Sequence, residues 1–302
     1  MRKNRSLDSL RRLAARHCVG DGRKFRLKDV DPGDVGALGD ETKDDARRLL
    51  EEGVGRLARL QEKLYAGGEW SLLLIFQAMD AAGKDGTIKH VMSGVNPQGC
   101  QVVSFKAPSR EELAHDFLWR CVRALPERGR IGIFNRSYYE EVLAVRVHRD
   151  LLEAQRLPAR LIGRDLWERR FEDICAFESH LAREGVVIRK FFLHVSKKEQ
   201  RKRLLERLED PDKHWKFSEN DLRQRPSWRE YMRAYEEMVR RTSSRDAPWY
   251  VVPADHKWYT RLVVAAAVVD ALEALGLQFP KAPPAKKREL DRARRELMSE
   301  GS

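Results

Sequence analysis

The chain has 302 residues, and its 59 lysines and arginines exceed its 47 aspartates and glutamates, which gives a formal net charge of +12. This length predicts one large domain with extensions rather than two small domains, and no apolar run is long enough to span a bilayer, which excludes a transmembrane protein. The charge indicates a polyanionic partner, such as nucleic acid, anionic lipid or a phosphate-rich substrate, or simply a solvated basic surface.

Two different patterns precede the first apolar run. Residues 1–40 combine basic residues with glycines and with an Asp-Pro-Gly-Asp turn at 31–34, which predicts an extended, partly ordered N-terminal arm. Residues 41–65 then repeat leucines at helical spacing. We therefore expect an amphipathic helix that ends at Gly67 and Gly68.

Five short apolar runs follow, and helical patterns lie between them. The first run, at 70–76, is continuous and bounded by glycines and a polar turn, as is typical of strands in a parallel sheet covered on both faces. Strands alternating with helices predict right-handed βαβ units and a three-layer α/β/α fold with a parallel five-stranded sheet. The other strands are expected at 100–105, 130–134, 186–193 and 249–252, and helices at 111–125, 165–183, 197–208, 227–242 and 258–275.

Two segments depart from this alternation. Residues 209–247, between the fourth and fifth strands, are polar, charged and dotted with aromatic side chains, which suits a mobile helical lid or an ordinary surface hairpin of helices. Residues 281–302 are proline-rich and then charged, which predicts a charged C-terminal tail or an oligomer contact. Residues 41–280 would form the main domain.

The first strand leads into the small-residue turn QAMDAAGKDGT at 77–87 and then into a helical pattern. This combination predicts a phosphate-binding loop (P-loop), in which backbone N–H groups surround an anion and the ammonium group of Lys84 reaches the terminal phosphates. The loop residues expected to bind substrate are Ala81, Ala82, Gly83, Gly86 and Thr87.

The loop departs from the general pattern G-x-x-x-x-G-K-[ST] at two positions. Ala78 stands where the first glycine belongs, and Asp85 replaces the hydroxyl residue that binds magnesium. Carboxylates in a polyanion site are costly unless a divalent cation lies between them and the phosphates, so we interpret Asp80 and Asp85 as catalytic residues that handle Mg²⁺. As alternatives, Asp85 would only complement the helix dipole and Asp80 would only form a turn.

A second polar cluster follows the strand at 130–134. Ligands of open α/β sheets gather at the carboxyl ends of the strands, so Asn135 and Arg136 should face the same crevice as Lys84. Arg136 can bind phosphate with two hydrogen bonds, and Asn135 stands where many P-loop proteins have an aspartate. Alternatively, Ser137 caps a helix and Arg136 pairs with Glu140.

Three segments, 78–109, 117–148 and 216–262, together resemble the polyphosphate kinase 2 family, and the resemblance covers roughly 40–275. It implies a thymidylate-kinase-like P-loop fold, a homo-oligomer, and Mg²⁺-dependent phosphoryl transfer between inorganic polyphosphate and nucleoside mono- or diphosphates. It also implies catalytic roles for Asp80, Lys84, Asp85 and Arg136. Many members have aspartate at the position of Asn135. The Asn-Arg-Ser motif at 135–137 resembles the branch that accepts both AMP and ADP.

Further basic residues could bind a chain of phosphates, although each alone would be an ordinary surface charge. These substrate-binding candidates are Lys106, Arg120, Lys216 and Arg223. The expected partners are polyphosphate and adenine or guanine nucleotides, with no nucleic acid and no membrane. Two other functions stay open: an ATP-dependent nucleotide kinase, and a polyanion-binding protein without catalysis.

The four cysteines are widely separated and form neither a CxxC pair nor a zinc-binding spacing. We therefore expect reduced thiols. The basic N-terminus also lacks the apolar segment of a secretory signal. Both features predict a cytoplasmic protein.

Overall fold

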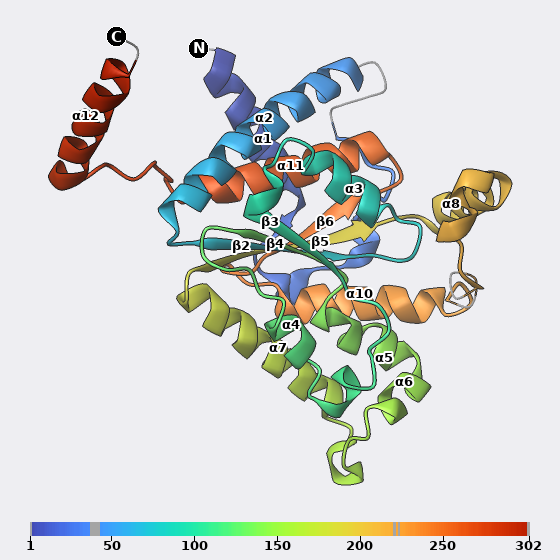
Figure 1. Ribbon diagram of the computed structural model, residues 1–302. Helices are drawn as coiled ribbons and strands as arrows, with labels where there is room; N and C mark the ends of the chain where they lie inside the picture. Colours follow the sequence, from blue (N-terminus) through green and yellow to red (C-terminus); the bar gives the residue numbers. More distant parts are fainter. Residues whose placement is uncertain (1, 37–42, 220–221, 223, 301–302) are drawn as a thin grey trace.

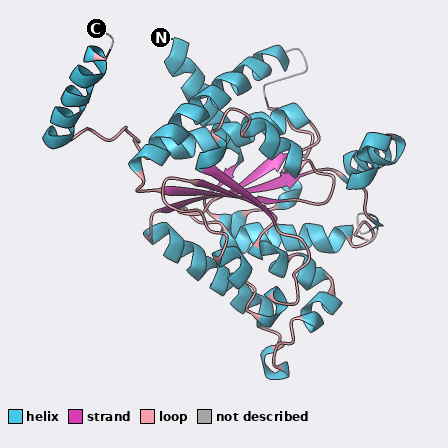
Figure 2. Ribbon diagram, viewed as in Figure 1, coloured by secondary structure: helices cyan, strands magenta, loops and turns pink. Residues whose placement is uncertain are grey.

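The computed structural model describes residues 2–36, 43–219, 222 and 224–300. A central sheet lies between two layers of helices (Figures 1 and 2). The strands follow the order β1-β6-β5-β2-β4-β3, and all neighbours are parallel except β1 and β6. The strands are β1 (Cys18–Val19), β2 (Ser71–Gln77), β3 (Cys100–Ser104), β4 (Ile131–Asn135), β5 (Val186–His194) and β6 (Trp249–Pro253).

The five parallel strands confirm the expected three-layer α/β/α fold. All seven residues of β2 are buried, because helices cover both faces of the sheet and neighbouring strands pair with both of its edges. This explains why its sequence is apolar without alternation. Since β2, β4 and β5 run in the same direction, the loops after them meet at one end of the sheet.

The helices divide between the two faces (Figure 1). The most buried helix is α11 (Lys257–Glu273), whose middle residues are apolar all round because it packs between the sheet and two outer helices. On its face lie α1 (Arg2–His17), α2 (Lys43–Gly67) and α3 (Lys84–Val91). On the other face lie α4 (Trp119–Val122), α5 (Ala144–Val147), α6 (Arg149–Ala154), α7 (Leu166–Arg183) and α10 (Trp228–Thr242).

The N-terminal segment differs from the extended arm expected for residues 1–40. Helix α1 packs against α11, with Leu10 and Ala14 buried, and β1 adds a sixth, antiparallel strand to the sheet. The sheet therefore has six strands rather than five. A strand of two residues is too short for any periodicity to reveal it.

The lid expected at 209–247 is also different. Helix α8 (Lys197–Glu209) follows β5, and the described residues of the polar stretch after it include the short helix η8 (Pro211–Lys216) before α10 begins. Tyr235, Met238 and Val239 of α10 are buried in the main core. Because these side chains anchor α10 to the sheet, only 209–227 remains as a candidate lid.

The helix expected at 111–125 is interrupted. Only residues Glu112–Ala114 and Trp119–Val122 are helical, and Asp116 lies between them. The Asp116 carboxylate accepts a hydrogen bond of 2.9 Å from Leu118 N. Such a local bond competes with the helical hydrogen bonds and explains the break.

The C-terminal tail forms a helix, α12 (Pro284–Ser299), that stands away from the body of the protein (Figure 1). None of its residues is buried. Across the described residues, no helix is long and apolar enough to cross a membrane.

A matched pair of substitutions tests this assignment of packed and unpacked helices. Leu10 in α1 is 2% exposed and Leu290 in α12 is 51% exposed. Leu10→Ala should lower the free energy of unfolding by about 2–5 kcal/mol, because it leaves a cavity in the core. Leu290→Ala should change it by less than about 0.5 kcal/mol. Urea denaturation measures both values, and equal losses would contradict the packing of α1.

Candidate active site

The loop between β2 and α3 has the backbone shape of an anion-binding site. Ala81 has φ 61° and Gly83 has φ 104°, both in the left-handed region. Gly83 is the N-cap of α3, so the first N–H groups of this helix have no partner within the helix. Left-handed residues next to a helix N-terminus direct several N–H groups toward one point, which favours an anion there.

Lys84 is the first residue of α3, and its side chain folds back over the loop. It is 8% exposed, and its Nζ donates a 3.0 Å hydrogen bond to the carbonyl of Ala78. Burial lowers the pKa of Lys84, as does the nearby charge of Arg136, while Asp80 raises it. A bound phosphate would add negative charge and stabilise the ammonium form.

Arg136 follows β4 and reaches the loop from the neighbouring strand. Its backbone is left-handed (φ 63°), and its N–H bonds to the carbonyl of Phe76 at 3.0 Å. The guanidinium donates to Asp80 Oδ1 at 2.5 Å. The pKa of Arg136 is raised by Glu140 and by Asp80, against the effect of burial. The ion pair of Arg136 is therefore with Asp80, and Glu140 contributes charge.

Asn135 and Asp85 form the second contact between the two strand ends. Asn135 Nδ2 donates to Asp85 Oδ1 at 2.6 Å and lies 3.4 Å from the hydroxyl of Ser104. The amide thus acts as a donor that orients the Asp85 carboxylate. Asp80 and Asp85, predicted from sequence as a pair, lie at the same end of the sheet but each has a different partner.

The described residues offer few side chains that could bind a metal ion here. In the described chain, no group of three or more His, Cys, Asp or Glu side chains could hold a metal ion. Mg²⁺ usually takes one or two carboxylates and completes its shell with water and substrate phosphates. Two aspartates beside a phosphate loop fit a divalent cation that prefers oxygen ligands.

Helix α8 supports the loop from behind, which sequence reasoning missed. The buried guanidinium of Arg203 donates to the carbonyls of Ala81 (3.3 Å) and Ala82 (2.8 Å), and Gln200 Nε2 donates to the carbonyl of Asp80 (3.0 Å). Because a peptide C=O and the next N–H point in opposite directions, these contacts turn the N–H groups of the loop away from α8. In the sequence, Arg203 was one of several arginines in a charged helix.

The same guanidinium also joins the loop to another element. Arg203 Nη2 donates to the carbonyls of Ala254 (2.6 Å) and Asp255 (3.0 Å), which follow β6. Arg225, at the end of the candidate lid, donates to Gln200 Oε1 at 2.6 Å. Gln200 therefore contacts both the lid end and the loop.

A cavity of about 610 Å³ opens beside Arg136. Phe105, Glu140 and Tyr231 lie in its wall together with Lys106 and Arg120, two residues predicted to bind substrate. Arg120 Nη1 donates to the carbonyl of Lys106 at 2.8 Å and its guanidinium lies 5.4 Å from the Phe105 ring centroid. This volume can hold a small ligand such as a nucleotide.

Glu141 also lines this cavity. It is 4% exposed and forms a 3.1 Å ion pair with Arg170 and a 2.7 Å hydrogen bond with Gln155. Burial raises the pKa of Glu141 and Arg170 opposes that effect. The distance in sequence between the two partners hid this pair.

Of the two lid candidates, Lys216 is the one that the described residues include. Lys216 is exposed at the end of η8, and its ammonium lies 5.0 Å from the ring centroid of Trp215. Arg223 lies outside the described residues. The other predicted loop residues, Gly86 and Thr87, are in the first turns of α3, where Thr87 N bonds to the carbonyl of Gly83 at 2.9 Å.

Comparison with known proteins identifies the family. Residues 40–280 match the family described as polyphosphate kinase 2. The chain belongs to that family. It is 54% identical over 259 residues to "ADP-polyphosphate phosphotransferase" of Rhodopseudomonas palustris, covering 85% of this chain and 90% of the relative. It is 47% identical over 263 residues to "AMP/ADP-polyphosphate phosphotransferase" of Meiothermus ruber, covering 86% and 93%.

A solved structure supports the same membership. The crystal structure of polyphosphate kinase 2 from Arthrobacter aurescens TC1 superposes with a TM-score of 0.83 at 44% sequence identity, covering 93% of this chain and 96% of that one. The sequence resemblance to the polyphosphate kinase 2 family is therefore confirmed, and with it the fold.

The contacts of Arg203 generate a prediction for this polyphosphate kinase 2 chain. Arg203→Met should lower the rate of phosphoryl transfer by about 10²-fold, because small displacements of reacting groups have effects of that size. The rate of Arg203→Lys should lie between the rates of Arg203→Met and the unchanged chain. The exposed neighbour Arg201 offers a control, and Arg201→Met should stay close to normal. Initial rates measure all three, and equal rates for the two Met variants would exclude the support role.

Proposed function

We propose that this chain transfers phosphoryl groups from inorganic polyphosphate to AMP and to ADP, forming ADP and ATP with Mg²⁺ as cofactor. One observation carries the proposal. Lys84 and Arg136, from two neighbouring strand ends, converge with Asp80 at a phosphate loop that opens beside a cavity of about 610 Å³. Membership of the polyphosphate kinase 2 family supports this chemistry.

On the donor side, the loop and Lys84 hold the phosphoryl group to be transferred. Phosphoryl transfer requires little covalent participation from the protein, since positioning and neutralisation of charge supply most of the catalysis. The N–H groups of Ala81, Gly83 and the first turn of α3 bind the oxygens, and the ammonium of Lys84 balances their charge.

Asp80 and Asp85 are the residues that would hold Mg²⁺. The ion would neutralise phosphate oxygens and bring the carboxylates and the polyanion into one site. Asn135 orients Asp85 through its amide, so this residue supports the site without adding a third negative charge.

On the acceptor side, Arg136 stands between the loop and the cavity. A nucleotide in the cavity would present its terminal phosphate to this guanidinium, which can bind two oxygens at once. The attacking oxygen belongs to a phosphate that is already anionic, so no strong general base is needed. Closure of residues 209–227 would exclude water and limit hydrolysis.

The remaining phosphates of the donor require further positive charge beyond the loop. Lys257, at the start of α11, supplies one such group near Arg203 and Arg261. The pKa of Lys257 is lowered by burial and then by Arg203. Lys106, Arg120, Lys216 and Arg223 remain candidates for the same task or for the nucleotide phosphates. A chain of phosphates bound by several cations would make affinity strongly salt-dependent.

The choice of AMP as well as ADP rests on the Asn-Arg-Ser motif at 135–137 and on the relative from Meiothermus ruber, whose name includes both nucleotides. The relative from Rhodopseudomonas palustris is named for ADP alone, so this part of the proposal needs its own test. Guanine nucleotides are proposed as secondary acceptors, and the protein as a homo-oligomer. The four cysteines are free thiols, which supports a cytoplasmic location.

The test uses the purified protein with Mg²⁺, long-chain polyphosphate and either AMP or ADP, without ATP, and nucleotides are separated by chromatography. ADP and ATP should appear from AMP. Product from ADP alone would retain polyphosphate as the donor and reject AMP as an acceptor. Transfer only after ATP is added would instead indicate an ordinary nucleotide kinase.

Lys84→Ala should reduce this activity by at least about 10²-fold, the typical effect of removing one group that stabilises transition-state charge. Lys89 lies on the same helix and is exposed, so Lys89→Ala is the matched control and should stay close to normal. Near-normal turnover by Lys84→Ala would remove the phosphate loop from the mechanism.

A further inference from the structure

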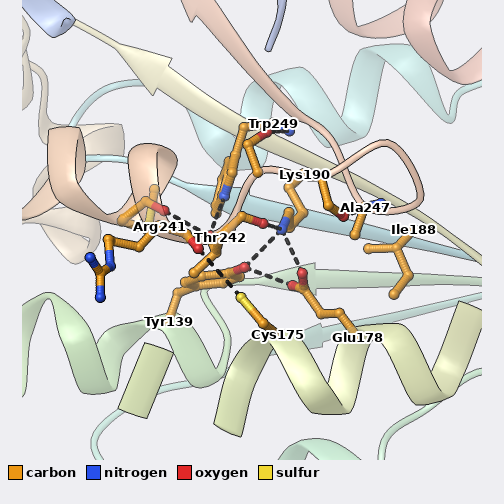
Figure 3. Close-up of polar contacts among 12 residues, drawn as sticks. Tyr139, Cys175, Glu178, Ile188, Lys190, Arg241, Thr242, Ala247 and Trp249 are labelled. Carbon is orange, nitrogen blue, oxygen red and sulfur yellow. Dashed lines mark hydrogen bonds and ion pairs between the residues drawn. The ribbon is translucent and has the colours of Figure 1, made fainter. Parts of the chain in front are cut away.

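A fully buried ammonium group lies in the core on the α7–α10 face of the sheet. Lys190 of β5 is 0% exposed. Its Nζ donates to Glu178 Oε2 at 2.6 Å, to the hydroxyl of Tyr139 at 2.9 Å and to the carbonyl of Thr242 at 2.8 Å (Figure 3). An ammonium has three N–H donors, so all of them are satisfied.

The surroundings of Lys190 come from four separate elements. Glu178 is on α7, Tyr139 is in the short helix η6 (Tyr138–Val142), and Thr242 is the last residue of α10. The ammonium also lies 5.2 Å from the ring centroid of Trp249 and 5.3 Å from that of Tyr139. Lys190 therefore joins the central sheet to α7, η6 and α10.

Glu178 binds two consecutive tyrosines. Its Oε1 accepts hydrogen bonds from Tyr138 at 2.8 Å and from Tyr139 at 2.7 Å, while Oε2 accepts from Lys190. Both tyrosines are buried, and Glu178 itself is 3% exposed. Two directional bonds to neighbouring residues fix the rotation of η6 as well as its position.

These tyrosines come directly after Arg136 and Ser137. Ser137 Oγ accepts from Tyr139 N at 3.2 Å and lies 3.0 Å from the side-chain amide of Gln77 at the end of β2. Arg136 is thus held on one side by its bond to Phe76 and on the other by the anchored tyrosines. A left-handed arginine is unfavourable and persists only where its surroundings impose it.

A buried ion pair is weak evidence for stability, since apolar residues of the same volume often serve as well. Apolar residues could not, however, accept hydrogen bonds from the tyrosine hydroxyls. We propose that Lys190 and Glu178 are positioning residues for phosphoryl transfer, which hold Tyr138 and Tyr139 and thereby fix the guanidinium of Arg136 at the phosphate loop. This inference rests on the proposed function and names residues that set the geometry of its site.

Tyr139→Phe removes a single hydroxyl and tests whether the tyrosine bonds position Arg136. Tyr259→Phe is the matched control, because Tyr259 is also 0% exposed and its hydroxyl bonds to His17 Nε2 at 2.8 Å on the opposite face of the sheet. Both variants should melt at similar temperatures. Turnover with polyphosphate should fall about tenfold in Tyr139→Phe and stay within about twofold in Tyr259→Phe.

A pair of double variants separates the hydrogen bonds from the charges. Lys190→Met with Glu178→Gln removes both charges but keeps an oxygen acceptor for the tyrosines, whereas Lys190→Met with Glu178→Leu removes the acceptor too. The Gln variant should keep turnover within about threefold of normal, and the Leu variant should lose about tenfold or more. Equal turnover in the two double variants would overturn the role of the tyrosine bonds.

A kinetic cycle with Arg136→Lys decides whether the effect passes through Arg136. Single-turnover rates with excess enzyme make slow variants measurable. In the Arg136→Lys background, Tyr139→Phe should cost less than about twofold, because coupled residues are not additive. The same tenfold loss in both backgrounds would overturn the inference. Absence of any polyphosphate-dependent product from the unchanged chain would instead reject the proposed function.

Discussion

The geometry of the candidate site depends on which way three successive peptide groups face. The carbonyls of residues 80–82 each accept a hydrogen bond from Gln200 or Arg203 of α8. With those oxygens occupied, the N–H groups of Ala81 and Gly83 face the other side of the loop, as an anion requires. The N–H of Ala82 instead bonds to the carbonyl of Met79 at 3.3 Å. This arrangement explains why α8 must follow β5 directly, since β5 pairs with β2 and brings the helix to the back of the loop.

The site also contains charges of both signs. Lys84 and Arg136 stand against Asp80, Asp85 and Glu140, and the amide of Asn135 orients Asp85 without adding charge. An excess of cations would bind any polyanion tightly and release it slowly. The mixture of signs within the loop favours a substrate that arrives with a divalent cation, because the carboxylates then gain a partner.

Sequence reasoning predicted what local pattern encodes. The parallel strands were predicted because continuous apolar runs have few other uses, and the strand, turn and helix at 70–91 were predicted from small residues around Lys84. Long-range contacts left no such trace. The hydrogen bonds of Arg203 join residues more than a hundred positions apart. Helix α10 was mistaken for part of a lid because its arginines and glutamates outnumber the apolar residues on its buried side. Asp116 ended a helix through one local hydrogen bond.

The short strand β1 has a consequence for how the protein behaves among its own copies. A sheet edge with unpaired N–H and C=O groups is a template on which another chain can add a strand. Pairing of Cys18 and Val19 with β6 occupies part of one edge of the sheet, and α1, which precedes β1, lies over the neighbouring face. The N-terminal segment therefore protects this part of the edge from pairing with another copy. Two residues are enough, because the position of β1 matters more than its length.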